Sequence, residues 1–397
     1  TNITPEEIDR IFQAATKTVP TKQVVGTILP FRVIVDICRL GIAPLVQYLG
    51  IKTKHEAENS IDRGNFFDQA PTRRGIMNII PPLFLFFAQF RSGIIGAAGN
   101  HFLDLMKVTE VVDPVVASKF NLRKGQYILM VHCGSGILGQ YTMYMFTAKK
   151  REHLSTAILM NIGRFFWFTP FKKTIRMIAE KIRASDFGKA EPLITFDGDG
   201  EDGRLYMAAR RACSNFAHAN RATITHNFIS TAESVLGRPI EADLLYDMPH
   251  ILVSEEEHYG KNLWVHRNGT SRAYGPSRMA THPLFRETGE PAFIPTSMST
   301  EAYLCVGQDG NDTSFHSCNH GAGKAAKTSE TVVPESKEAL HEKLATRGVK
   351  LYNGRSSKVI EQDSSHYKRA EDVIESVVEN NVVKPVVKMQ PISVIMY

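Results

Sequence analysis

The spacing of hydrophobic residues predicts a helical beginning to the chain. The segment "TPEEIDRIFQAA" at 4–15 places Thr4 at a helix cap and Pro5 at the first helical position. Helical patterns then dominate up to about residue 92. The most apolar stretch among them, "IIPPLFLFFAQF" at 79–90, is too short to span a bilayer. We expect it to be a buried helix of the core, with an assembly surface as the alternative.

Beyond residue 92 the pattern becomes mixed. "GNHFLDLMKV" alternates in the manner of a strand, and "GQYILMVHCGSG" predicts an apolar strand that runs into a glycine-rich turn. The acidic segment "DGDGEDG" lacks the spacing of a calcium-binding EF-hand, which favours a solvated turn. We expect helices at 170–184, 203–235 and 336–348, short strands within 248–323, and an apolar strand at the C-terminus.

This alternation predicts one interleaved α+β domain rather than a string of modules. No internal repeat or long low-complexity linker divides the sequence. Residues 1–92 would form a mainly helical N-terminal part and residues 93–397 a core that carries the motifs.

Composition narrows the class of protein only slightly. The 47 basic and 41 acidic residues give a net charge of +6, which permits a polyanionic partner without requiring one. Five scattered cysteines without a Cys-x-x-Cys pair favour a reducing, intracellular compartment. The sequence shows no signal peptide or membrane span, and because it does not begin with Met we expect a processed or trimmed chain.

Four histidines stand where chemistry is expected. His101, His132 and His250 each lie where a strand meets a turn, and His320 precedes Gly-Ala-Gly in "SFHSCNHGAGK". Imidazole can bind a metal, move a proton or attack phosphorus. A single histidine is more often a hydrogen-bonded structural residue, and the four are too far apart in sequence for a zinc finger. Any shared site must therefore be assembled by the fold.

Two basic segments are candidates for binding phosphate. "HRNGTSRAY" carries Arg267 and Arg272 around a glycine turn, and "HGAGK" adds Lys324, although a solvated hairpin explains them equally well. The glycine-rich turns match neither a P-loop nor a dinucleotide-binding fingerprint. "GSG" likewise does not complete the nucleophile elbow of a serine hydrolase.

The ordered motifs resemble the RtcB family of RNA-splicing ligases, which use GTP and Mn²⁺. The matching segments cover most of residues 93–397 and are "GNHFLD", "VHCGSGILG", "LYMAARRACSNFAHANRATITHNF", "YDMPHILVSEEEH", "VHRNGTSRAY", "FIPTSMSTEAYLCVG", "SFHSCNHGAGK" and "HYKRAEDVIESVVENNVVKPVVKMQPISVIM". The resemblance implies a compact α+β fold with antiparallel sheets flanked by helices.

The resemblance also implies a role for each candidate. His320 would attack the α-phosphate of GTP and become guanylated, and His101, His132 and His250 would bind Mn²⁺. The GMP would pass to an RNA 3′-phosphate, or one derived from a 2′,3′-cyclic phosphate, and a 5′-hydroxyl would then displace it. The implied nucleotide-binding residues are Asn100, Phe102, Asp104, Ser297, Met298, Ala322, Gly323 and Tyr367, and the implied RNA-binding residues are Arg267, Arg272 and Lys324.

The sequence departs from the family pattern at several points of this implied site. The early Asp-x-x-Cys-Gly motif is absent, and "VDICRLG", with Asp36 and Cys38, is one residue too short to replace it. Ile251 stands where an asparagine is expected, Glu301 where a serine is expected, and Met396 where a lysine is expected. "GSGILG" lacks the arginine of the family's turn.

Two hypotheses follow from these motifs and departures. The favoured one is an RNA ligase that acts on RNA with GTP and Mn²⁺. The other is a degenerate homologue that serves as a structural or RNA-binding subunit, with protein partners in a larger assembly. Both predict an intracellular protein without a membrane segment, and neither excludes a viral or organellar origin.

Overall fold

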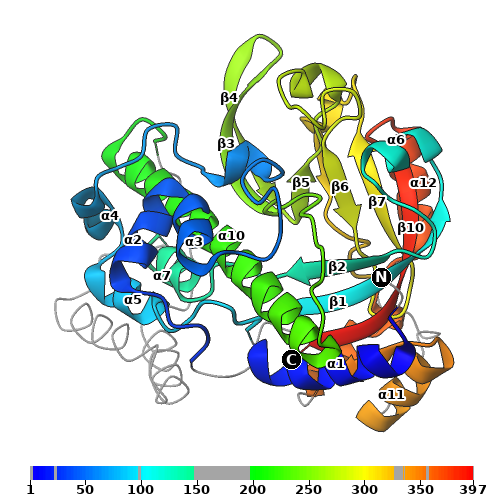
Figure 1. Ribbon diagram of the computed structural model, residues 1–397. Coiled ribbons are helices and arrows are strands. Elements are labelled where there is room, and N and C mark those ends of the chain that lie inside the picture. The colour runs from blue at the N-terminus through cyan, green and yellow to red at the C-terminus, as the bar shows by residue number, and fades with distance from the viewer. Residues whose placement is uncertain are drawn as a thin grey trace, which may run out of the picture.

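The computed structural model describes residues 3–21, 25–96, 100–146, 197–325, 334, 336–354 and 357–396. Figure 1 shows a sheet on one side of the molecule, a cluster of short helices on the other, and one long helix that reaches both. No helix in these ranges combines the length and apolarity needed to cross a bilayer.

A six-stranded sheet forms the centre of the motif-bearing part. Its order is β2-β1-β10-β7-β6, with β9 also paired to β10. Every pairing is antiparallel except that of β9 with β10, which confirms the antiparallel α+β fold predicted from the sequence. The strands are β1 (Phe102–Val111), β2 (Tyr127–His132), β6 (Pro291–Ile294), β7 (Ala302–Gly307), β9 (Lys350–Tyr352) and β10 (Val383–Met396).

Two smaller sheets stand beside this one. β3 (Ile251–His258) and β4 (Lys261–Asn268) form an antiparallel hairpin that projects at the top of Figure 1. β5 (Thr270–Arg272) follows the hairpin directly and pairs with β8 (Ser317–Asn319). The order of these strands brings the segment after β4 next to the segment after β8.

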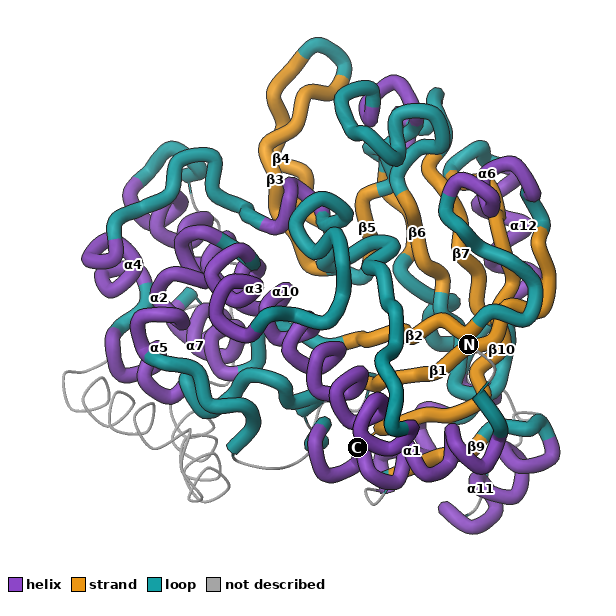
Figure 2. The backbone as a smooth tube through the Cα atoms, in the orientation of Figure 1, coloured by secondary structure: helices purple, strands orange, loops and turns teal. Residues whose placement is uncertain are grey.

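The long helix α10 (Glu201–Leu236) links the two sides of the molecule, as Figure 2 shows. Its buried residues occur on all sides, which is expected for a helix surrounded by other elements. The shorter helices are α1 (Pro5–Thr18), α2 (Phe31–Leu40), α3 (Ala43–Leu49), α4 (Arg73–Ile79), α5 (Pro82–Ala88), α6 (Pro114–Lys119), α7 (Ile137–Met145), α11 (Lys337–Thr346) and α12 (Ala370–Glu379). The 3₁₀ turns are Ile61–Gly64, Pro276–Met279, Asp312–Ser314, Ser357–Gln362 and Ser364–His366.

Helix α1 begins as its sequence predicts. The Thr4 hydroxyl accepts a hydrogen bond from the Glu7 backbone, and the Glu7 carboxylate accepts one from the Thr4 backbone, so the two residues form a capping box. One apolar core joins α1 to α10 and to the central sheet through Phe12, Phe228 and Tyr352. A second core holds α2, α5 and α7 against α10.

The apolar stretch at 79–90 is only partly buried. Within α5, Leu85 is fully buried, whereas Leu83 and Phe86 keep 38% and 48% of their surface exposed. The helix therefore contributes to the core with one face only. The expected helix at 170–184 lies outside the described residues.

Candidate active site

Four histidines from distant parts of the chain lie together at the edge of the central sheet. His132 ends β2, His101 immediately precedes β1, His250 immediately precedes β3, and His320 follows β8. The centroid distances between neighbouring rings are 5.7 Å for His101–His132, 4.7 Å for His132–His250 and 4.3 Å for His250–His320. The fold thus assembles the cluster that sequence spacing alone could not provide.

The backbone of Gly269 joins His250 to His320. Its N–H donates to the His250 carbonyl at 2.9 Å, and its carbonyl accepts from His320 Nδ1 at 2.6 Å. Because a carbonyl can only accept, Nδ1 of His320 carries a proton, so in the neutral ring the lone pair is on Nε2. His320 is therefore oriented as a nucleophile would need to be.

The other three rings are held in their neutral form. His101 Nδ1 donates to the Ile95 carbonyl at 2.9 Å, which leaves its Nε2 lone pair free. Burial lowers the pKa of His250 to about 3 and that of His132 well below its usual value, with the neighbouring histidines adding to both shifts. Burial also lowers the pKa of His101. Neutral imidazole is the form that binds metal.

Two residues of α10 form hydrogen bonds to the turns that carry these histidines. Arg221 forms two hydrogen bonds to the Asp247 carboxylate, at 2.7 and 3.0 Å, and a third to the Cys133 carbonyl at 2.9 Å. Asn220 donates to the carbonyls of Ile94 and Gly134 and accepts from the Gly93 backbone. Sequence reasoning missed both residues, although "HANRA" lay inside a matching motif.

The cluster supplies metal-binding donors but not a finished coordination shell. Within the described ranges, no three His, Cys, Asp or Glu side chains are arranged to hold a metal ion. The ring planes of His132 and His250 are only 20° apart and stacked, so their in-plane lone pairs lie in nearly parallel planes and do not converge on one point between the rings. The rings must turn before they can share one cation. Imidazole nitrogen is a suitable ligand for Mn²⁺, but the observed ring orientations do not direct the three nitrogens at one ion.

Three of the expected nucleotide-binding residues are linked to this cluster through β1. Phe102 stacks on His132 at 5.3 Å and packs against the apolar cluster that contains Met298. Asp104, two residues along β1, is 4% exposed, and its Oδ1 has no hydrogen-bond partner. Burial raises the pKa of this carboxyl well above its usual value. A ligand that offered hydrogen-bond donors would satisfy it.

The loop that follows His320 connects the remaining expected residues. The Ala322 N–H donates to Pro295 in the segment before Ser297, and the Gly323 carbonyl accepts from Lys368, next to Tyr367. The Tyr367 hydroxyl donates to Gln362, and the Ser297 hydroxyl lies 2.8 Å from that of Thr300. Asn100 is exposed at the entrance to β1. The nucleotide-binding roles of these residues remain predictions.

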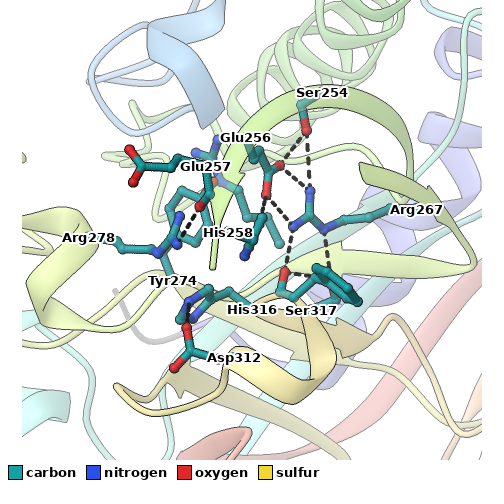
Figure 3. A network of polar contacts seen from close by, with 12 residues as sticks. Ser254, Glu256, Glu257, His258, Arg267, Tyr274, Arg278, Asp312, His316 and Ser317 are labelled. Atoms are coloured by element: carbon teal, nitrogen blue, oxygen red, sulfur yellow. Dashed lines mark hydrogen bonds and ion pairs between the residues drawn. The ribbon is translucent and has the colours of Figure 1, made fainter. Parts of the chain in front are cut away.

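The two arginines expected to bind RNA are engaged within the protein. Arg267 is 2% exposed and pairs with Glu256, while Ser317 and the Phe315 carbonyl accept its other donors, as Figure 3 shows. Arg272 pairs with Glu290 and Asp62. These contacts favour a structural role for both side chains.

Lys324 is placed differently from the two arginines. Its side chain is exposed, and its Nζ lies 3.5 Å from the Glu361 carbonyl. Of the three basic residues expected to bind RNA, it is the one whose side chain is exposed to solvent, because Arg267 is buried and Arg272 is mostly buried.

The structure also locates the residues that depart from the family pattern. Ile251 begins β3 beside His250 and is 45% exposed, whereas Met396 is 4% exposed and packs with Met298. Asp36 pairs with Arg73, and Cys38 is buried in the helical core. These last two residues therefore contribute nothing to the histidine cluster.

Comparisons with known proteins agree with this arrangement of motifs. A family model described as "tRNA-splicing ligase RtcB" matches residues 89–397. The chain is 31% identical over 306 residues to the tRNA-splicing ligase RtcB of Pyrococcus horikoshii, an alignment that covers 75% of this chain and 32% of that protein.

Two further relatives give similar values. Identity is 29% to the tRNA-splicing ligase RtcB of Archaeoglobus fulgidus, over 76% of this chain and 58% of that protein. It is 28% to the RNA-splicing ligase RtcB of Mycobacterium bovis, over 74% of this chain and 62% of that protein. The match thus spans between about a third and three-fifths of the length of these relatives. On the extent of the family match, the chain belongs to the RtcB family.

Proposed function

We propose that this protein is an RNA ligase that joins an RNA 3′-phosphate to a 5′-hydroxyl through a guanylated histidine, with GTP and Mn²⁺. The observation that carries the proposal is the orientation of His320. Its Nδ1 proton is fixed on the Gly269 carbonyl, so Nε2 is the nitrogen available for attack. Family membership supplies the class of reaction.

In the proposed first step, His320 Nε2 attacks the α-phosphorus of GTP. A P–N bond forms, the P–O bond to pyrophosphate breaks, and pyrophosphate leaves. Bound Mn²⁺ would supply Lewis-acid stabilisation of the phosphate oxygens, with His101, His132 and His250 as the residues that hold it. Phe102 and Asp104 would form the floor of the guanine site, where the buried Asp104 carboxyl meets the N–H donors of the base.

In the second and third steps the nucleotide is transferred and then released. A 3′-phosphate oxygen of RNA attacks the phosphorus of the guanylated His320, the P–N bond breaks, and imidazole is regenerated. The 5′-hydroxyl of the other RNA end then attacks the activated 3′-phosphate and GMP leaves. Lys324, an exposed residue four positions after His320, would meet RNA phosphates.

Incubation with α-³²P-labelled GTP and Mn²⁺ tests the first step. We expect label on the protein that is lost in acid and is absent from His320→Ala. His266→Ala is a suitable control, because His266 is an exposed residue of β4. Stable label in His320→Ala would overturn the assignment of the nucleophile.

One observation favours a second function, that of a non-catalytic structural or RNA-binding subunit. Met396, where the resemblance expects a lysine, is an apolar side chain buried against Met298. A pocket that lacks this charge binds triphosphate less well. No label from GTP with any divalent metal, together with retained RNA binding, would support this alternative.

A further inference from the structure

A polar cavity lies between α10 and the β3–β4 hairpin. Its volume is about 450 Å³, within the range of small-molecule sites. Arg210, Arg211 and Ser214 line it from α10, and residues 252–256 line it from β3. None of the site residues named above for GTP lines this cavity.

Some of the charged residues that line the cavity have an ion-pair partner among the residues that the structure describes, and others do not. Glu256 is paired with Arg267, and Arg272 is paired with Asp62 and Glu290. By contrast, no ion pair involves Arg210 or Arg211 within the described part of the chain, and the buried Arg210 Nε has no hydrogen-bond partner. A guanidinium donor that is buried and unpaired is costly, and an anionic acceptor would relieve that cost.

Two carboxylates of the lining, Asp68 and Glu255, carry the opposite charge. Both are exposed, so solvent and salt weaken their effect on a bound anion. Asn262, which also lines the cavity, offers an amide donor and acceptor. The lining therefore combines guanidinium groups for phosphate with carboxylate and amide groups that a nucleobase edge can use.

Two elements lead from the cavity toward the histidine cluster. Leu252, its first lining residue on β3, is two residues beyond His250. On α10, Arg210 and Arg221 are separated by three helical turns, so they share one face about 16 Å apart. Arg221 is the residue that contacts the turn after His132 through the Cys133 carbonyl. A strand whose end reaches the histidines can thus extend into this cavity.

From these contacts we infer that the cavity is a subsite for single-stranded RNA, and that it holds a nucleotide near the end to be joined. Arg210 and Arg211 bind its phosphates. The inference rests on the proposed function, because it takes RNA to be the substrate of the histidine cluster. It assigns phosphate binding to side chains other than Arg267 and Arg272, whose donors are already used within the protein.

Binding of a fluorescent single-stranded RNA with a 3′-phosphate, followed by anisotropy at several salt concentrations, tests the inference. For single strands the log–log salt slope is about 0.7 per phosphate neutralised, so loss of both contacts should reduce its magnitude by about 1.4. We expect R210Q/R211Q to bind at least about tenfold more weakly at low salt. R210K/R211K should keep the wild-type slope, because it keeps both charges.

Arg123→Gln provides the matched control, since Arg123 is an exposed arginine that does not line the cavity. It should bind as the wild type does. An unchanged slope and affinity in R210Q/R211Q, in protein whose circular dichroism is native, would overturn the subsite.

Labelling with GTP on the same wild-type sample separates the two proposals. A wild-type protein that is labelled, but whose RNA binding does not depend on the arginine pair, retains the ligase function and loses the subsite. A protein that is not labelled, but whose RNA affinity does depend on the pair, retains the subsite and loses the ligase function.

Discussion

At the scale of single residues, the orientation of the His320 ring depends on a glycine backbone. Gly269 has a φ of +74°, which side-chain-bearing residues adopt at a cost of about 1–2 kcal/mol. This conformation directs its carbonyl to His320 Nδ1 and its N–H to His250. A Cβ at this position would lie 3.5 Å from His320 Cε1.

We therefore expect Gly269→Ala to slow guanylation of His320 by about tenfold or more and to reduce the free energy of unfolding by about 1–2 kcal/mol. The first effect arises because a shifted carbonyl no longer fixes the tautomer. Rates of label incorporation and urea unfolding measure the two effects.

Gly260→Ala separates strain from catalysis. Gly260 has a φ of +70°, and nothing lies within 4 Å of a Cβ built there. The Gly260→Ala variant should lose about as much free energy of unfolding as Gly269→Ala, while its labelling rate stays at the wild-type value. Equal labelling by both variants would show that Gly269 does not orient His320.

The sequence identified only some of the residues that form the candidate site. His101, His132 and His250 could be chosen because each stands where a strand meets a turn, and His320 because it precedes Gly-Ala-Gly. Asn220 and Arg221 could not be chosen in this way, because they lie within a long helix whose polar residues resemble an ordinary solvated face. Their role depends on which turns the fold brings against α10.

At the scale of elements, the β3–β4 hairpin is held by a buried ion pair that also links it to the segment before β8. Arg267 of β4 and Glu256 of β3 are both buried, and Glu256 also accepts from His258 at 3.0 Å. Arg267 holds the pKa of Glu256 at about 2, against the effect of burial. The stability that this lowered pKa provides is present above about pH 4.5 and is lost as the pH falls toward 2.

Removing one member of the Glu256–Arg267 ion pair should therefore destabilise the protein. We expect Glu256→Gln to reduce the free energy of unfolding by about 3–5 kcal/mol at pH 7, because it leaves the Arg267 guanidinium buried without a counter-charge. Glu257→Gln changes an exposed neighbour on the same strand and should alter stability by less than about 0.5 kcal/mol. Similar urea midpoints for the two variants would contradict a structural role for the pair.

Helices and strands were predicted well where the hydrophobic residues recur with a clear helical or strand spacing. The sequence predicted α1, α10 and α11, together with β1, β2 and β10, close to their observed positions. The N-terminal part was harder, because it consists of short helices separated by turns that depend on tertiary contacts. Asp62 and Arg63, for example, adopt positive φ angles that no local motif announces.

At the scale of the whole molecule, the helical N-terminal part and the central sheet share α10. Phe12 of α1 is fully buried and lies 5.2 Å, between ring centroids, from both Phe228 of α10 and Tyr352 of β9. The helices α2, α5 and α7 meet the same α10 through a second core. An element common to both cores should make them unfold together, as a single domain requires.

We expect Phe12→Ala to reduce the free energy of unfolding by about 3–5 kcal/mol, because it opens a cavity between α1, α10 and β9. Far-UV circular dichroism and tryptophan fluorescence should report one coincident urea transition in the wild type and in the variant, shifted to lower urea in the latter. Tyr48→Ala, at a side chain that is 49% exposed on α3, should leave the midpoint almost unchanged. Two separate transitions, of which Phe12→Ala moves only one, would show that residues 1–92 and 93–397 are independent units, because a shared α10 could not then be coupling the two cores.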